Sequence, residues 1–497
     1  MSASSTAIVG MLVVAGGVML FLSPHPDVAA LCLLGVLSLA LWLLAHSLVP
    51  ERREVQFLSW VLFATIGLRF VWAVIEHYVY PSLQYMLQAD SLVVLHMGRE
   101  LAMDWRGGVS RPTVPSDLSD VHDWLHTYRS AFLFLWFGYS PLLPEVTNIV
   151  LSASSALAGY MVVRRWASVR AARIAALVIA FWPSIMVWST HNLKDPVNLA
   201  AVTWSTFGIL QLRDRVTLSA FATVISAWVV GFLIRPYLGV LAITGQMVAI
   251  GLIAVKSRTA LGRYLAIVLT LVLGGVSLTV GNRQIKQMYG ESVSLQYAEE
   301  KRQTFYEGAV EDRAVGVRHS EYVIDLRASS TAGALLQLPL RIPLFLLSPI
   351  PVRLGSLPLM GTYPEMVFLY WLIPPFILGL RHVWRRYREE AIFVLCTVAP
   401  IIVVFSIGTS ISGEAVRYRD IILPELLLFA AVGWAARVEA RQAAAETRRA
   451  RSSPRTTKNG KALVLGGAEV PVKGSMSSGP DGRRQAGKGR KVRPAPR

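Results

Sequence analysis

The stretch AALCLLGVLSLALWLLAHSLV, residues 29–49, decides the class of fold. It contains no Asp, Glu, Lys or Arg, and an apolar run of about 20 residues can cross the roughly 30 Å hydrocarbon core of a bilayer as one helix. Similar runs recur along the 497-residue chain, which is 54% hydrophobic and only 16% charged. Soluble domains are about 25% charged. The sequence therefore predicts an all-α, polytopic membrane protein.

We expect about twelve membrane-spanning helices. They are placed near residues 7–23, 28–49, 57–80, 142–163, 171–190, 196–212, 216–234, 237–255, 263–281, 363–380, 390–408 and 420–436. The first run lacks the basic region and the small-residue cleavage site of a signal peptide, so we expect it to be a retained span.

Positive charge sorts the connections between these spans. The short basic connections contain Arg52, Arg53, Arg164, Arg165, Arg170, Arg173, Arg213, Arg215, Lys256, Arg258, Arg263, Arg381, Arg385, Arg386 and Arg388. All of them fall on one side if the N-terminus is inside, and the positive-inside rule assigns that side to the cytoplasm. Both termini are then cytoplasmic. The long loops 81–141 and 282–361 face outward, where we expect any chemistry.

The net charge of +18 is concentrated in the last segment of the chain. Residues 437–497 contain 16 Lys and Arg against 4 Asp and Glu, with no sustained apolar period. We expect residues 1–436 to form the membrane domain and residues 437–497 a disordered, basic cytoplasmic tail that lies near membrane lipids. A nucleic-acid partner is not indicated. Cys32 and Cys396 lie in apolar runs, and no Cys/His spacing suggests a zinc site.

The first group of candidate site residues follows the span 57–80. Glu76 and His77 lie near its outer end, and Asp90 opens an amphipathic segment that also carries Glu100. The apolar positions of this segment suit a helix at the membrane interface. Asp90 could cap that helix, or it could act as a general base. Residues 111–130 contain Asp and His at spacings that match no metal motif, so we expect a solvated loop there.

A second group lies in FWPSIMVWSTHNLKDPV, residues 181–197, which changes from apolar to polar within a few positions. His191, Lys194 and Asp195 could shape a site on the outer face. Alternatively, Asp195 caps the next span and Lys194 extends to the lipid headgroups.

A third group consists of arginines at the outer ends of other spans. Arg235 precedes a proline, and Arg417 and Arg419 lie at the start of the last span. Five prolines between residues 339 and 358 preclude a full-length spanning helix, which predicts a re-entrant or interfacial segment with Arg341 beside it. Guanidinium groups are well shaped to bind phosphate or diphosphate, although they can also anchor helix ends at headgroups.

Three stretches resemble the GT-C superfamily of polytopic glycosyltransferases in bacterial cell-surface polysaccharide assembly. They are ADSLVVLHMGRELA (89–102), FWPSIMVWSTHNLKDP (181–196) and AVRYRDIILPELLLFAAVG (415–433). The resemblance implies a sugar donor linked to polyprenyl phosphate, an acceptor glycan or lipid on the outer face of the plasma membrane, and a catalytic carboxylate in the first outer loop. Asp90 is the position that matches. In the family this loop follows the first span, whereas here it follows the third, and the family's paired Asp-Glu is absent.

Three functions stay open on the sequence. The first is a membrane glycosyltransferase with Asp90 as the base and Glu76, then Glu100, as substitutes. The second is a polysaccharide polymerase or ligase that grips a diphosphate through Arg235, Arg341, Arg417 and Arg419. The third is a flippase or exporter of lipid-linked saccharides, which the mostly apolar spans, with Arg69 as one exception, and the lack of an internal repeat disfavour. No cofactor is assigned, and a requirement for a divalent metal is left open.

Overall fold

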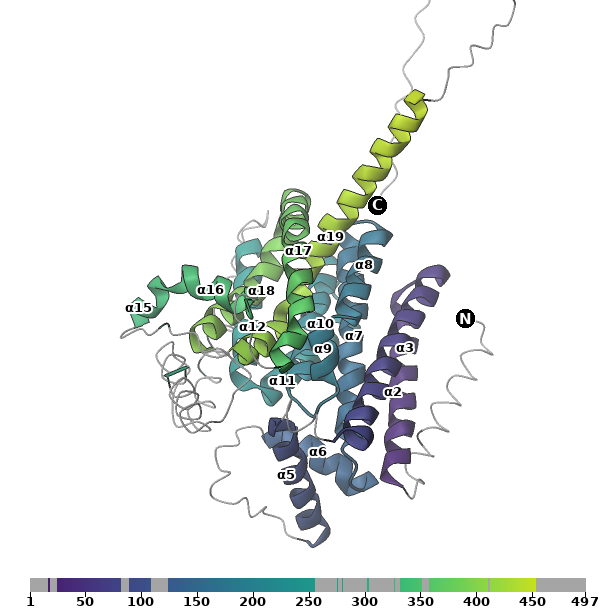
Figure 1. Ribbon diagram of the computed structural model, residues 1–497, viewed down its shortest axis with the longest axis vertical. Helices are drawn as coiled ribbons and strands as arrows, with labels where there is room; N and C mark the ends of the chain where they lie inside the picture. The colour runs from purple at the N-terminus through teal and green to yellow at the C-terminus, as the bar shows by residue number, and fades with distance from the viewer. Residues whose placement is uncertain are drawn as a thin grey trace, which may run out of the picture. The chain divides into compact units, whose positions relative to one another are not determined.

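The computed structural model describes residues 25–81, 89–108, 124–254, 331–350, 357–409 and 412–452, together with a few single positions. These residues form helices and turns, with no strand among them (Figure 1). The helices are α2 (Pro26–Leu48), α3 (Arg52–Val74), η1 (Ile75–Val79), α5 (Ala89–Arg106), α6 (Trp124–Phe137), α7 (Leu142–Trp166), α8 (Val169–Ala180), α9 (Pro183–Ser189), α10 (Asp195–Asp214), α11 (Leu218–Ile234), α12 (Pro236–Ala254), α15 (Thr331–Leu336), α16 (Leu338–Leu347), α17 (Leu357–Arg386), α18 (Arg388–Gly408) and α19 (Ser412–Ser452). The all-α prediction is confirmed for the described residues.

Six helices are long and apolar enough to cross a membrane, and a bent pair brings the number to seven. The six are α2, α3 with η1, α7, α17, α18 and α19, and the bent pair is α8 with α9. The helices α10, α11 and α12 form where spans were predicted, but α11 and the apolar part of α12 are shorter than 18 residues. The predicted spans 7–23 and 263–281 lie outside the described residues, apart from single positions. The protein is therefore a helical membrane protein, with a smaller number of spans shown than predicted.

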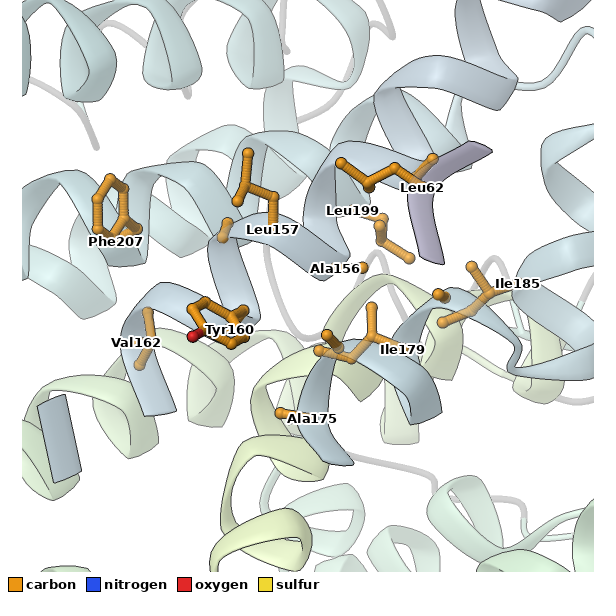
Figure 2. Close-up of a cluster of buried hydrophobic side chains, with 14 of the residues drawn as sticks. Leu62, Ala156, Leu157, Tyr160, Val162, Ala175, Ile179, Ile185, Leu199 and Phe207 are labelled. Atoms are coloured by element: carbon orange, nitrogen blue, oxygen red, sulfur yellow. The ribbon is translucent and has the colours of Figure 1, made fainter. Parts of the chain in front are cut away.

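Helix α7 is the centre of the packing. It contacts α2, α3, α8 and α10, and most of its length is enclosed by them. Figure 2 shows part of this core, in which Tyr160 and Leu157 of α7 lie among Leu62 of α3, Ile179 of α8 and other apolar side chains. The sequence of α7 between residues 152 and 159 consists mainly of Ser, Ala and Gly. Small side chains let neighbouring helices approach closely, which is the usual basis of helix packing in membranes.

A second close contact joins α17 and α19. A side chain added at Gly379 would clash with the backbone carbonyl of Phe429, and one added at Gly433 would clash with the carbonyl of Pro375. The two glycines face each other at the crossing point, so the backbones touch there without intervening side chains. This contact holds the long α19 against α17.

The predicted span 171–190 is a bent pair rather than one straight helix. α8 ends at Ala180, α9 begins at Pro183, and the two axes differ by 50°. Pro183 causes the break because it cannot donate a backbone hydrogen bond inside a helix, although it fits the first turn of a new one. After the bend, the chain leads into the polar turn at residues 190–194.

Two predictions about irregular segments can be compared with the structure. In the proline-rich region, α16 covers only residues 338–347, a length of roughly 15 Å. Such a helix is too short to span a bilayer, as the prolines predicted.

The predicted disordered tail begins too early at residue 437, because α19 continues to Ser452. Residues 453–497 lie outside the described part of the chain.

Candidate functional site

The guanidinium of Arg417 joins two carboxylates that are far apart in the sequence. Its Nη1 donates to Asp90 Oδ2 at 2.8 Å, and its Nε donates to Asp195 Oδ2. The side chain of Asp90 is 70% exposed, that of Arg417 is 18% exposed and that of Asp195 only 4%. Three segments of the chain, α5, α10 and α19, therefore meet at one ion-pair cluster, and only one of its members is open to solvent.

Asp195 has a second cationic partner inside the protein. Its Oδ1 lies 2.8 Å from Nη1 of Arg235, which is itself buried between α11 and α12. The guanidinium of Arg235 also lies over the rings of Tyr418 and Tyr237, at 5.2 and 5.7 Å from their centroids. A buried carboxylate between two guanidiniums is fully compensated in charge. We call Asp90, Asp195, Arg235 and Arg417 the Arg417 cluster.

The capping interpretations of Asp90 and Asp195 are wrong. Asp90 lies inside the first turn of α5, which begins at Ala89. Asp195 is the first residue of α10, and the N-cap position before it is occupied by Lys194, which makes no side-chain capping bond. Both carboxylates point to guanidiniums instead. Their position in the first turn still favours the negative charge, because the helix dipole is positive at that end.

Close packing of α5 against α6 fixes the position of Asp90. Leu95, Leu101 and other apolar residues of α5 are buried, as the amphipathic pattern predicted. A side chain at Gly98 would lie only 2.9 Å from Cβ of Ser130, so this glycine allows the close approach. In Figure 1, α5 and α6 lie side by side below α3 and α7.

The polar turn at residues 190–194 is held by hydrogen bonds from three helices. Asn148 of α7 donates to the carbonyls of His191 and Leu193, at 2.7 and 2.8 Å. Arg129 of α6 donates to the side-chain oxygens of both Asn148 and Asn192, at 2.7 and 2.9 Å. These bonds place the start of α10, and with it Asp195, in one position.

Further bonds to the same turn come from α5 and α6. The backbone N–H of Asn192 donates to Ser91 Oγ at 3.0 Å, and His126 Nε2 donates to the Asn192 carbonyl at 3.0 Å. His126 is buried, and burial lowers the pKa of its imidazole well below the usual value. The prediction of a solvated loop is therefore wrong at His126, because α6 begins at Trp124 and buries this face. Residues 109–123 lie outside the described residues.

Glu76 and His191 form a buried pair beside the Arg417 cluster. Glu76 lies in η1, a π-helical turn at the end of α3, and its Oε2 is 3.2 Å from His191 Nε2 and 3.3 Å from Thr190 Oγ1. His191 Nδ1 lies 2.9 Å from the carbonyl of Val187, which can only accept, so Nδ1 carries the hydrogen. Burial lowers the pKa of His191 to about 4. Its imidazole is neutral at pH 7, with the Nε2 lone pair directed toward Glu76.

The remaining predicted residues are spread over other places. Lys194 is half-buried at the start of α10, close enough for its charge to act on His126 and Asp195. Glu100 lies on the exposed face of α5, ten residues after Asp90. Arg341 is buried in α16 and donates to the carbonyls of Ile407 and Leu326 and to Gln337.

Arg419 belongs to a separate cluster. It donates to Glu365 at 3.1 Å and to the carbonyls of Leu346 and Ser348 at 3.2 and 2.8 Å, with only 1% of its side chain exposed. It follows Arg417 by two residues, and positions two apart on a helix do not share a face. The expected pair of neighbouring arginines is thus divided between two clusters.

The sequence analysis did not identify several residues of this region. Arg129, Asn148 and Glu145 lay in segments interpreted as a loop or as part of an ordinary span. Glu145 accepts from His77 Nε2 at 2.8 Å and is fully buried. A polar residue inside a predicted span is the signal that could have identified Asn148 and Glu145, since such residues are rare in membrane helices and usually functional or paired.

Among the described residues, no group of three or more His, Cys, Asp or Glu side chains is placed to hold a metal ion. Compared with models of known protein families and with curated proteins, the sequence has no match in either set.

Proposed function

We propose that the protein is a membrane glycosyltransferase that moves a sugar from a polyprenyl-phosphate donor to a glycan or lipid acceptor on the outer face of the plasma membrane. The observation that carries this proposal is the exposed carboxylate of Asp90, held 2.8 Å from the guanidinium of Arg417. A base and a phosphate-binding group are thereby adjacent at the ends of apolar helices. This is the pair of groups that transfer from a phosphate-linked sugar requires.

The chemistry follows from the roles of these two groups. Arg417 binds the donor phosphate, and the phosphate takes the place of Asp90 as its exposed partner. Asp90 is then free to accept the proton of the acceptor hydroxyl while that oxygen attacks the anomeric carbon. The bond from the anomeric carbon to the phosphate oxygen breaks, and polyprenyl phosphate leaves with the electron pair. Asp195 and Arg235 act as positioning residues, because they hold Arg417 from the buried side.

The neighbouring groups fit supporting roles. Glu76 and His191 lie behind the cluster as a neutral imidazole and a carboxyl group in contact. Lys194 adds positive charge beside Asp195. We therefore keep Lys194 as a donor-binding residue and Glu76 as the substitute base. Glu100 loses support, because it is exposed on α5 ten residues beyond Asp90.

The polymerase or ligase alternative loses part of its support. It needs several arginines around one diphosphate, whereas Arg341 and Arg419 each bond to carbonyl groups of their own surroundings. Only Arg235 and Arg417 share a partner, Asp195.

The transporter alternative gains a specific observation. Asp420 and Glu425 are buried in α19, with exposed fractions of 3% and 0%. Neither carboxyl group makes a hydrogen bond within the described residues. Asp420 lies at the start of the last span, with Oδ1 3.9 Å from Nε of Arg419, whereas Glu425 lies inside the run that the sequence analysis treated as apolar. Ionisable groups inside a span mark ion and proton pathways in many transporters. A flippase or exporter of lipid-linked saccharides is therefore the second candidate.

Removal of the gene separates these functions through the lipid-linked intermediate that accumulates. A transferase predicts a polyprenyl-phosphate sugar, extractable and exposed on the outer face of the membrane. A polymerase or ligase predicts a polyprenyl-diphosphate glycan on the same face. A transporter predicts a lipid-linked saccharide that only reagents on the cytoplasmic side can modify. Mass spectrometry of the extracted lipids, combined with labelling of intact cells, makes the distinction.

A further inference from the structure

A large hollow lies at the other end of α7 from the Arg417 cluster. It has a volume of about 430 Å³ and opens between the end of α7, the end of α17 and the middle of α19. Binding sites for small molecules usually fall in the range of about 300–1,000 Å³. The hollow is thus large enough for a headgroup rather than for a single ion.

Basic side chains dominate the charged lining of this hollow. Arg164, Arg165 and Arg386 line it, against a single carboxylate, that of Glu439. Arg165 forms an ion pair with Asp214, with an Nη2–Oδ2 distance of 2.6 Å. Within the described part of the chain, Arg164 has only a looser contact with Glu51, at 3.5 Å, and both of these side chains are well exposed. The charge of Arg164 is therefore available for another anion.

Arg386 is the least compensated of these cations. It is exposed near the end of α17, and no described carboxylate lies within ion-pair distance of it. Glu439 lies at the hollow but accepts a hydrogen bond from Ser168 at 2.7 Å. The hollow therefore combines two available guanidiniums with one carboxylate that already has a partner.

The depth of the hollow in the membrane points to the class of ligand. Its walls include Tyr387 and Val432 in addition to the polar groups. α7 begins at Leu142, near the polar turn at residues 190–194, and ends at Trp166, which lines the hollow. An α-helix of this length is roughly 37 Å long. The hydrocarbon core is roughly 30 Å thick, so a helix of this length reaches from one headgroup layer to the other. With the basic connections on the cytoplasmic side, as the positive-inside rule predicts, the hollow falls at the inner headgroups. Basic pockets between helices on the cytoplasmic side of membranes bind anionic lipid headgroups.

We propose that this hollow binds the phosphate of an anionic phospholipid of the inner leaflet, through Arg164 and Arg386. The same guanidiniums could also bind a free phosphate ester from solution, because the contacting group is identical. The aromatic and aliphatic wall favours the lipid, whose glycerol and first methylene groups lie against it. This site is independent of the proposed transfer reaction.

Native mass spectrometry of the full-length protein in detergent tests the proposal. Phosphatidylglycerol is titrated against the protein, with phosphatidylcholine as the zwitterionic comparison and inorganic phosphate as a competitor. Each lost basic contact should weaken the affinity roughly fivefold, which corresponds to about 1 kcal/mol per Lys or Arg near an anionic surface. Arg164→Gln and Arg386→Gln should each show this loss, and the double variant roughly the product.

Two further variants keep the result interpretable. Arg385→Gln makes the same charge change on the same helix, at an exposed residue that does not line the hollow, and should leave binding unchanged. Glu439→Gln removes the carboxylate from the lining and should strengthen the binding of phosphatidylglycerol, a gain that misfolding cannot produce. Equal binding of both lipids, or equal losses in Arg385→Gln and Arg386→Gln, would overturn the proposal. Displacement of the lipid by millimolar inorganic phosphate would overturn the lipid assignment and leave a site for a soluble phosphate.

Discussion

Arg417 and Arg419 are separated by one residue on α19 and yet belong to two different kinds of environment. Arg419 is buried and bonds to Glu365 and to two backbone carbonyls, while Glu365 also accepts from Trp182 and twice from Ser184. Arg417 has one buried partner, Asp195, and one exposed partner, Asp90. The same type of side chain is thus enclosed by buried protein groups at Arg419 and has a solvent-exposed partner at Arg417.

This difference indicates which cluster is structural and which can bind a ligand. A guanidinium whose partners are all buried cannot exchange them without opening the fold. An exposed ion pair contributes only about 0–1 kcal/mol to stability, so a substrate anion can replace its carboxylate at little cost. We therefore expect Arg419 to stabilise the contact between α17 and α19, and we propose Arg417 for ligand binding.

The largest effect on stability is expected from Arg419→Gln. This change leaves Glu365 as a buried carboxylate without its cation, a loss that typically costs about 3–5 kcal/mol of unfolding free energy. Arg417→Gln is the matched control and should cost clearly less, because Asp195 keeps Arg235. Thermal unfolding in detergent measures both. Equal losses in the two variants would remove the distinction between the clusters.

The buried His191 is expected to contribute about 3 kcal/mol of pH-dependent stability by itself. The pKa of His191 is about 4 in the folded protein, against an ordinary value of 6.5, so the unfolded chain binds more protons between these two pH values. Stability is complete above pH 6.5 and falls toward pH 4 by about 1.4 kcal/mol per pH unit for this one group. His126 acts in the same direction.

The control for this pH dependence is His191→Gln, which removes one titrating group. Unfolding midpoints between pH 7.5 and 4.5 should decline less steeply in the variant than in the original protein. Parallel declines in the two proteins would show that His191 is not responsible.

A smaller effect is expected from Asn148→Ala. The change removes the donor to the carbonyls of His191 and Leu193 and leaves Arg129 with one acceptor fewer. An unsatisfied buried polar group costs about 1–3 kcal/mol. Because the turn positions Asp195, activity should fall more than stability does. Ser154→Ala serves as the comparison on the same helix, since Ser154 lies away from the turn. A fully active Asn148→Ala protein would show that the turn does not position the site.

The sequence predicted the helical class and most of the helix positions because long apolar runs have few alternatives to a membrane helix. It also identified Asp90, Asp195, Arg235 and Arg417, since charged residues at span ends are easily recognised. It could not show that these four meet, because their contact depends on how α5, α10 and α19 pack. The burial of His126 was missed for the same reason. The break at Pro183 was overlooked although the proline itself is the signal for it. Glu425 was overlooked because one carboxyl group hardly changes the hydropathy of a long apolar run.

The most direct test of the Arg417 cluster as the site is the rate of sugar transfer by the Asp90→Asn variant, measured at matched amounts of folded protein. Asn retains the size of Asp and loses the base, so we expect unchanged stability and a transfer rate that is lower by roughly 10²–10⁴-fold. Glu100→Gln, an equivalent change on the exposed face of the same helix, should leave the rate unchanged. An Asp90→Asn protein that transfers sugar at the original rate would contradict the account and move the assignment of the base to Glu76.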